Sequence, residues 1–178
     1  MTDYAALLRG IYPSNPNMSN EKLRGVFESL GFVGVGSVLA SGNIVFKTDA
    51  VDVVGLEDRI QKALNAELGI AGGTIIRTRD ELQTLLDKDP VDGLVHGRGT
   101  YLTATFLKHP ATNPDGEQIE SDQFTRIVGY DAAARAVLAV TDNSEPGQTP
   151  DFMGRVEQAY GKDITTRTWL TVQRIVTK

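Results

Sequence analysis

The sequence contains no cysteine, a single tryptophan and only two histidines among its 178 residues. The absence of cysteine excludes disulfides, zinc sites built on thiolates and cysteine nucleophiles. His96 lies in a glycine-rich segment and His109 precedes a proline, and neither belongs to an H-E-x-x-H or similar spacing. Both are therefore expected to be ordinary loop residues. The sequence predicts no metal site, no cofactor and no catalytic residue.

The chain also lacks a long apolar run and an excess of positive charge. No apolar segment approaches the roughly 20 residues that a membrane helix requires, and MTDYAALLRG has no basic leader. A net charge of −5 repels phosphate backbones, and the K/R-G-F/Y-G/A-F strand of RNA-binding modules is missing, so nucleic acid is not an expected partner. We expect a soluble, cytoplasmic, monomeric protein without membrane contact.

The first half of the chain alternates strand and helix signals. Leu23, Val26, Phe27 and Leu30 fall at i, i+3, i+4 and i+7, which is typical of a helix whose start Ser19 can cap. The expected strands are residues 3–11, 35–40, 44–47 and 74–78, and the expected helices are residues 18–30, 56–68 and 80–87. The glycine-rich segment GFVGVG matches no phosphate-binding loop and is expected to form turns.

The second half repeats this order after the segment DPVDGLVHGRG, whose proline and glycines are typical of a linker. We predict a first repeat at 1–89, a linker at 90–99 and a second repeat at 100–178. The expected strands here are residues 101–108, 126–130, 136–141 and 164–167, and the expected helices are residues 152–160 and 169–176. A polar helix or loop is expected at 115–124.

A short internal match supports duplication. IRTRDELQTLLDK aligns with TRTWLTVQRIVTK and places Arg77 over Arg167 and Thr78 over Thr168. Each half has the order β-α-β-β-α-β followed by a helix, which is the split βαβ plan of ferredoxin-like folds. The predicted fold class is α+β, with two ferredoxin-like repeats, mainly antiparallel sheets, packed as one compact unit. In each sheet the first strand should lie beside the third.

This topology brings the segment LASGNIVF to the same sheet edge as Arg9. Gly42 and Asn43 suit the centre of a type II′ hairpin turn, in which Ser41 and Asn43 bond local backbone. Alternatively, Ser41 and Asn43 form a small anion site with Arg9 and the N–H groups of the first helix. Ser41 lacks the G-x-S-x-G setting of a nucleophile.

Two further residues lie near the C-terminus. Arg167 ends a predicted strand directly before a helix, where it is either a paired structural arginine or an anion contact at the helix N-terminus. Thr168 is a plausible N-cap for that helix. Trp169 falls at i, i+3 and i+7 with Val172 and Val176, which indicates core packing.

YAALLRG at the start, LGF followed by a strand and SGNIVF, and TRTW before an apolar helix together resemble domain-of-unknown-function family 1697. The resemblance extends over essentially the whole chain and implies an α+β fold of two ferredoxin-like repeats, with no established activity. The chain departs from the family pattern at IYPSNPN, which has no lysine, and at TPDFMGR, which replaces a Ser-Lys-Leu-like segment. Both departures remove positive charge.

Two functions are compatible with these observations. The first is binding or processing of a small phosphate- or carboxylate-bearing ligand at the edge that carries Arg9, Ser41 and Asn43, assisted by Arg167. The alternative is a non-catalytic module that binds another protein. The sequence identifies no substrate and no reaction.

Overall fold

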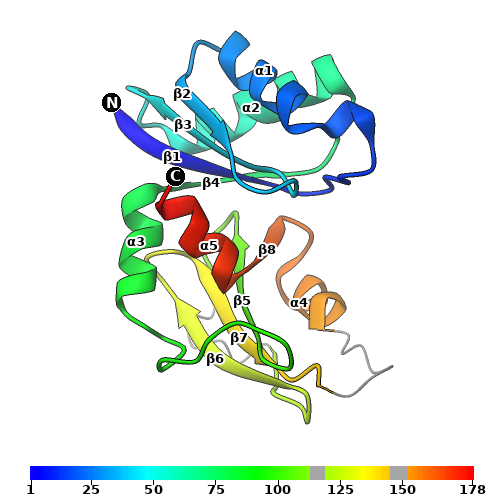
Figure 1. Ribbon diagram of the computed structural model, residues 1–178, viewed down its shortest axis with the longest axis vertical. Helices are drawn as coiled ribbons and strands as arrows, with labels where there is room; N and C mark the ends of the chain where they lie inside the picture. Colours follow the sequence, from blue (N-terminus) through cyan, green and yellow to red (C-terminus); the bar gives the residue numbers. More distant parts are fainter. Residues whose placement is uncertain (113–118, 145–151) are drawn as a thin grey trace. The chain divides into compact units, whose positions relative to one another are not determined.

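The computed structural model describes residues 1–112, 119–144 and 152–178 and divides into two compact units (Figure 1). The first unit comprises residues 1–82 and 174–178, and the second comprises residues 83–173. The assignment of residues 90–99 as a linker between repeats at 1–89 and 100–178 stays a prediction.

The first unit contains a four-stranded sheet and two long helices. Its elements are β1 (Thr2–Leu8), a 3-10 turn (Pro16–Met18), α1 (Asn20–Ser29), β2 (Val33–Ser37), β3 (Asn43–Thr48), α2 (Val53–Leu68) and β4 (Thr74–Thr78). The second unit contains β5 (Tyr101–Leu107), β6 (Thr125–Asp131), β7 (Ala136–Thr141), α4 (Phe152–Tyr160) and β8 (Ile164–Thr168). Helices α3 (Arg79–Asp87) and α5 (Trp169–Val176) each begin in one unit and end in the other.

The two sheets have the same strand order. The first is β2-β3-β1-β4 and the second is β6-β7-β5-β8, and every neighbouring pair is antiparallel. The first strand of each half thus lies beside the third, as predicted. The chain has an α+β fold with two four-stranded antiparallel sheets, and the described residues form five α-helices.

Local signals set the helix ends where the sequence predicted them. The Ser19 side chain accepts a hydrogen bond from the Lys22 N–H at 3.3 Å, and Gly31 follows the helix with a φ of +86°. Helix α2 ends at Gly69, whose φ of +68° is the left-handed conformation of a helix C-cap. Helix α3 begins with a capping box, because Thr78 Oγ1 accepts from the Glu81 N–H and the Glu81 carboxylate accepts from the Thr78 N–H.

One face of the first sheet packs against α1 and α2 (Figure 1). Phe46 is central to this core, with its ring centroid 5.5 Å from Tyr4, 5.3 Å from Phe27 and 4.6 Å from Phe32. Such aromatic pairs add about 0.5–1.5 kcal/mol each to area burial. Because side chains alternate along a strand, Asp3, Ala5, Val45 and Lys47 lie on the opposite face of this sheet.

Among the residues that the structure describes, the second unit buries more threonines than the first. Leu107, Phe152, Val156 and Ile164 pack together, while Thr105 and Thr166 share a hydrogen bond of 2.8 Å between their hydroxyls. Part of the segment 115–124, predicted as a polar helix or loop, lies outside the described residues, and its described part, residues 119–124, contains no helix.

Asp131, at the end of β6, has a side chain that is only 11% exposed. Burial raises the pKa of its carboxyl, but hydrogen bonds from the Lys88 ammonium at 2.7 Å and the Ala134 N–H at 2.8 Å outweigh burial, so that the pKa lies below its ordinary value. This carboxylate fixes the connection between β6 and β7.

Two sequence-based expectations about glycines are wrong. Gly42 and Asn43 do not form a two-residue turn, because β2 ends at Ser37 and Asn43 already belongs to β3, which leaves a connection of residues 38–42. Gly34 and Gly36 lie inside β2 and not in a turn. A bulge between Val33 and Gly36 accommodates the φ of +60° at Gly34.

Candidate functional site

The sheet edge predicted from the sequence does form in the first unit. The Leu8 N–H donates to the Gly42 carbonyl at 2.9 Å, so the end of β1 contacts the β2–β3 connection. The Asn20 side chain, at the start of α1, donates to the Leu39 carbonyl at 2.8 Å. The end of β1, the start of α1 and the connection from β2 to β3 therefore meet, as predicted.

At this edge the polar side chains of the connection bond one another. Asn43 is fully buried, and its Nδ2 donates to the Val38 carbonyl at 2.9 Å and to Ser41 Oγ at 3.0 Å. Gly42 has a φ of +81°, and a Cβ there would lie 2.6 Å from Ile11. These contacts support the structural interpretation of Ser41 and Asn43. Ligand binding by Arg9, Ser41 and Asn43 stays a prediction.

Arg167 belongs to the second unit and is 8% exposed. Its Nη1 donates to Thr165 Oγ1 at 2.6 Å and to the Thr166 carbonyl at 3.0 Å. Burial lowers the pKa of Arg167 to about 10, so the guanidinium keeps its charge at neutral pH. These contacts support the structural interpretation of Arg167, and its role as an anion contact stays a prediction.

The internal match found in the sequence corresponds to equivalent positions. Arg77 is fully buried and lies opposite Ala5 in β1, and Arg167 lies opposite Ala104 in β5. The residue after each arginine caps a helix, since Thr168 Oγ1 accepts from the Thr171 N–H at 3.2 Å just as Thr78 caps α3.

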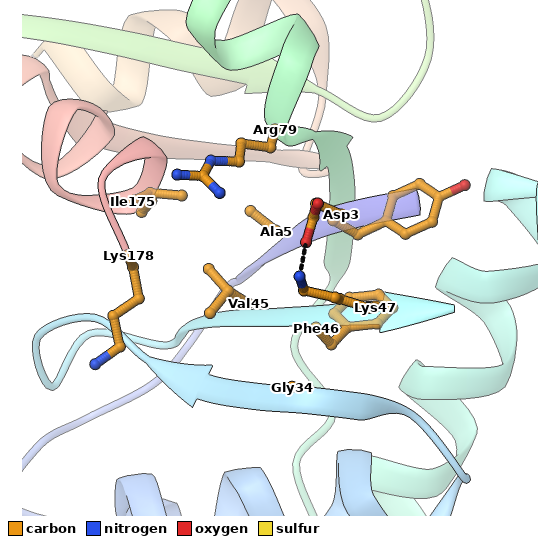
Figure 2. Close-up of a pocket in the computed structure, with 10 residues that line it drawn as sticks. Asp3, Ala5, Gly34, Val45, Phe46, Lys47, Arg79, Ile175 and Lys178 are labelled. Atoms are coloured by element: carbon orange, nitrogen blue, oxygen red, sulfur yellow. Dashed lines mark ion pairs between the residues drawn. The ribbon is translucent and has the colours of Figure 1, made fainter. Parts of the chain in front are cut away.

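A second polar region of the first unit has no counterpart among the sequence-based predictions. It is a cavity of about 100 Å³ on the sheet face that points away from α1 and α2 (Figure 2). We call it the basic cavity. Its lining consists of Asp3, Tyr4, Ala5, Gly34, Val45, Phe46, Lys47, Arg79, Ile175 and Lys178.

Two lining residues of the basic cavity come from the paired strands β1 and β3. Asp3 of β1 lies directly opposite Lys47 of β3, and the Asp3 carboxylate is 3.2 Å from the Lys47 ammonium. Both side chains are close to half exposed, so this cross-strand pair contributes little to stability. It does hold the ammonium at the cavity, as Figure 2 shows.

Glycines in β2 make room for the lysine side chains. A Cβ at Gly34 would lie 3.4 Å from Lys47 Cε, and a Cβ at Gly36 would lie 3.3 Å from Lys178 Cε and 3.2 Å from Val45. The aliphatic parts of both lysines thus run close over the backbone of β2, which a side chain at either position would crowd.

Arg79 is the third basic residue that lines the cavity. It is the first residue of α3, and its Nε donates to the Val176 carbonyl at 2.7 Å. This bond uses one of the five N–H groups of the guanidinium and orients the planar group. Figure 2 shows Arg79 above the cavity floor of Ala5 and Val45.

An open groove of about 420 Å³ adjoins the basic cavity along β2 and shares Gly34, Val45 and Lys178 with it. Arg24 of α1 lies in this groove and donates to Ser37 Oγ at 2.7 Å. The two spaces share these three lining residues, and both are lined by basic side chains.

The chemistry available in the basic cavity is that of charge recognition. Three basic side chains and one acidic side chain line it, together with the apolar side chains of Ala5, Val45 and Ile175. Across the part of the chain that the structure describes, no group of three His, Cys, Asp or Glu residues is arranged to hold a metal ion. No helix in the described ranges has the length and apolar composition needed to cross a membrane.

Sequence reasoning missed the basic cavity because its residues carry no local signal. Asp3 and Lys47 are far apart in the chain, and Arg79 and Lys178 are ordinary surface residues by sequence. Only the pairing of β1 with β3 brings the first two together.

The fold and the cavity define a two-sheet α+β protein with a basic cavity on one sheet. Comparison with family models matches residues 1–132 to the family described as "Protein of unknown function (DUF1697)". Because the match covers most of the chain, the protein belongs to this family, as the sequence motifs indicated.

A solved structure has a similar fold. The conserved bacterial protein SP0830 from Streptococcus pneumoniae matches with a TM-score of 0.71 and 16% sequence identity, over 99% of this chain and 97% of that chain. At this identity the likeness concerns the fold alone. No curated protein matches the chain.

Proposed function

We propose that the first unit binds a small anionic molecule, with a phosphate or carboxylate group, in the basic cavity. The observation that carries the proposal is the convergence of Lys47, Arg79 and Lys178 from separate elements on one cavity. The ligand class is the one expected from the sequence. The location proposed here is a different one, and ligand binding at Arg9, Ser41 and Asn43 stays a prediction.

The size of the basic cavity limits the ligand. Pockets for drug-sized molecules measure roughly 300–1,000 Å³, whereas this cavity measures about 100 Å³. A phosphate ion or a short carboxylic acid fits this space, and a whole nucleotide does not. Any larger part of a ligand extends into the adjoining groove beside Arg24.

The lining side chains contact different parts of such a ligand. The guanidinium of Arg79 presents a planar pair of donors that matches two oxygens of a carboxylate or phosphate. The Lys47 ammonium has three donors, of which the Asp3 carboxylate engages one. Ala5, Val45 and Ile175 offer an apolar surface to a short alkyl group.

The expected affinity is modest. A charged hydrogen bond contributes about 1.5–3 kcal/mol, so two such bonds contribute about 3–6 kcal/mol before the cost of association. The expected Kd is therefore roughly 1 mM or weaker. Because the basic side chains are exposed to solvent, added salt should weaken binding.

Titration with inorganic phosphate and with propionate, followed by NMR at low ionic strength, tests the proposal. Arg79→Gln should weaken binding at least about tenfold. Lys62→Gln is the matched control, since Lys62 is an exposed lysine of the same unit that pairs with Asp58 at 2.8 Å away from the cavity lining. Failure of both probes to shift the amide signals of β1 and β3, or equal effects of the two variants, would refute the proposal.

We also infer that the two halves descend from one ferredoxin-like unit by duplication. Identical strand orders and the equivalent positions of Arg77 and Arg167 support this inference. The structures of the two halves, expressed separately, test it: each half should recover its own sheet order. The alternative function, a protein-interaction module, stays a prediction.

A further inference from the structure

The groove that adjoins the basic cavity carries positive charge of its own. We call it the β2 groove, and it measures about 420 Å³. Two of its seven lining residues, Arg24 and Lys178, are basic, and no acidic residue occurs among the described residues that line it. On a chain with a net charge of −5, such a groove attracts anions locally. The positive lining thus extends beyond the basic cavity.

The floors of the two spaces are aligned by strand pairing. Ala5 of β1 lies opposite Val45 of β3, and Val45 lies opposite Gly36 of β2. Ala5 lines the basic cavity, Gly36 lines the β2 groove, and Val45 lines both. Neighbouring strands are about 4.8 Å apart, so Ala5 and Gly36 are separated by roughly 10 Å across the sheet. A ligand that occupies both spaces must therefore be elongated and must cross the strands.

Lys178 lies where the two spaces meet. Its side chain lines both of them, and a Cβ at Gly36 would lie 3.3 Å from Lys178 Cε. Figure 2 shows the side chain extending from the end of α5 towards β2 and away from Arg79. The Lys178 ammonium is one bond beyond Cε, so an anion above Gly36 meets this charge.

Arg24 reaches the β2 groove from the other face of the sheet. Ser37 follows Gly36 and pairs with the core residue Ile44, so its side chain points to the face that α1 covers. There Ser37 Oγ accepts from Arg24 Nη1 at 2.7 Å, which orients the half-buried guanidinium. Because β2 is at the edge of the sheet, the groove can pass from Lys178 on one face to Arg24 on the other.

Both basic groups keep their charge for a ligand. Among the residues that the structure describes, no acidic side chain forms an ion pair with Arg24 or Lys178. The bond to Ser37 uses one of the five N–H groups of the Arg24 guanidinium, and an ammonium has three donors. The groove therefore offers an anion several charged donors, in addition to those of the basic cavity.

We propose that the basic cavity and the β2 groove together bind a chain of two or three linked phosphates. One terminal phosphate lies in the basic cavity with Lys47 and Arg79, the next lies beside Lys178, and the far end of the chain faces Arg24. This inference rests on the proposed function, because the first phosphate uses the basic cavity. It extends that site by a second anionic position.

Charge determines the ligand class. Four basic side chains line the two spaces and Asp3 is the one carboxylate among the described lining residues, which leaves three positive charges. A single phosphate carries about 1.5–2 negative charges at pH 7, and two linked phosphates carry about three. A dicarboxylate of similar length carries about two, with an uncharged stretch beside Lys178. Linked phosphates match the lining more closely.

Four probes test the proposal: phosphate, diphosphate, triphosphate and glutarate, a dicarboxylate. Each is titrated into the protein at constant ionic strength, and amide NMR shifts are followed for residues 3–5, 33–37 and 45–47. Diphosphate and triphosphate should each bind at least about fivefold more tightly than phosphate and glutarate, because they gain charged contacts that solvent partly screens. They should also shift the amides of Gly36 and Ser37 more than phosphate does.

Arg24→Gln separates recognition of the second phosphate from recognition of the first. This variant should raise the diphosphate Kd about three- to tenfold and leave the phosphate Kd within about twofold of wild type. Arg24→Lys keeps the charge and should retain most of the diphosphate affinity. Lys22→Gln is the matched control, since Lys22 lies on the same helix and donates to Asn17 Oδ1 at 3.0 Å, outside both linings. It should change neither Kd.

The outcomes distinguish this inference from the proposed function. A phosphate titration without shifts overturns the proposed function and this inference with it. Phosphate binding without a gain for diphosphate, or equal diphosphate Kd values for Arg24→Gln and Lys22→Gln, overturns this inference alone. A further titration with ADP identifies the source of the phosphate chain: binding at least as tight as that of diphosphate supports a nucleotide, and weaker binding supports a free oligophosphate.

Discussion

A substitution at Gly72 should destabilise the first unit, because this glycine lies close to the main chain of Arg9. A Cβ at this position would lie 1.9 Å from the Arg9 carbonyl oxygen and 2.8 Å from its carbonyl carbon. Carbon and carbonyl oxygen normally approach no closer than about 3.3 Å. Gly72→Ala therefore requires the two segments to separate by roughly 1.4 Å, the difference between these distances. The atoms in the way are backbone, which cannot rotate aside.

The surrounding bonds resist this separation. The Arg9 N–H donates to the Gly73 carbonyl at 2.9 Å, and Leu8 pairs with Thr74 where β1 meets β4. Loss of one such hydrogen bond costs about 0.5–1.5 kcal/mol, and forced overpacking costs about 1–3 kcal/mol. We expect Gly72→Ala to lower the free energy of unfolding by about 2–4 kcal/mol.

Gly73→Ala is the matched control from the next position. A Cβ at Gly73 has no neighbour within 4 Å, and its φ is not in the left-handed region. Alanine there should be neutral or should stabilise the protein by about 0.4–1 kcal/mol, because it restricts the unfolded chain.

Urea unfolding gives the difference between the two variants, and amide hydrogen exchange in β1 and β4 shows whether the loss is local to their contact. Exchange in β4 should accelerate in Gly72→Ala and not in Gly73→Ala. Equal unfolding midpoints for the two variants would refute the close approach of Gly72 to Arg9.

Three further predictions concern other parts of the chain. Asp131→Asn should lower the free energy of unfolding by about 1–3 kcal/mol at pH 7, because the hydrogen bond from Lys88 then has an uncharged acceptor. Since the folded pKa of Asp131 is depressed, its contribution is present above the unfolded pKa of about 3.9 and is lost as pH falls through the folded pKa. Urea unfolding of wild type and variant should therefore give the same free energy near pH 2. Trp169→Ala should cost about 3–5 kcal/mol, since Trp169 is buried, and circular dichroism melting measures the loss; a midpoint unchanged from wild type contradicts core packing. Gly36→Ala should alter stability by less than about 1 kcal/mol but weaken phosphate binding, because its Cβ displaces Lys178, and a titration with unchanged Kd argues against a role for that lysine.

The sequence predicted the elements whose signals are local. The strand Thr74–Thr78 and the helices Phe152–Tyr160 and Trp169–Val176 have the predicted bounds. Apolar periodicity and capping residues determine such ends, and both act within a few residues of the chain. The internal match between the halves also predicted the equivalent positions of the two buried arginines.

Features that depend on distant partners were not predictable in the same way. Gly42–Asn43 has the composition of a two-residue turn, yet Asn43 pairs with Leu7 of β1 and so belongs to a strand. Gly34 and Gly36 look like turn residues, but their role is to leave space for lysine side chains that come from elsewhere in the chain. Convergence of the β1 edge could be inferred from topology, whereas the hydrogen bonds of the Asn43 side chain with Val38 and Ser41 depend on side-chain packing.

The two halves share equivalent main-chain hydrogen bonds but have different side chains at the equivalent positions. The bond from Arg9 to Gly73 has its equivalent in the bond from Lys108 to Asp163, and both join main-chain groups only. Main-chain bonds place few demands on side chains, so residues at equivalent positions can diverge while the sheets stay the same. At the acceptor position of this bond the first half has Gly73 and the second half has Asp163, so the two halves differ there in charge. It follows that ligands should be sought in the two units with separate readouts. Phosphate should shift the amides of β1 and β3 and leave those of β5 and β8 unchanged, and equal shifts in both units would argue against binding in the basic cavity.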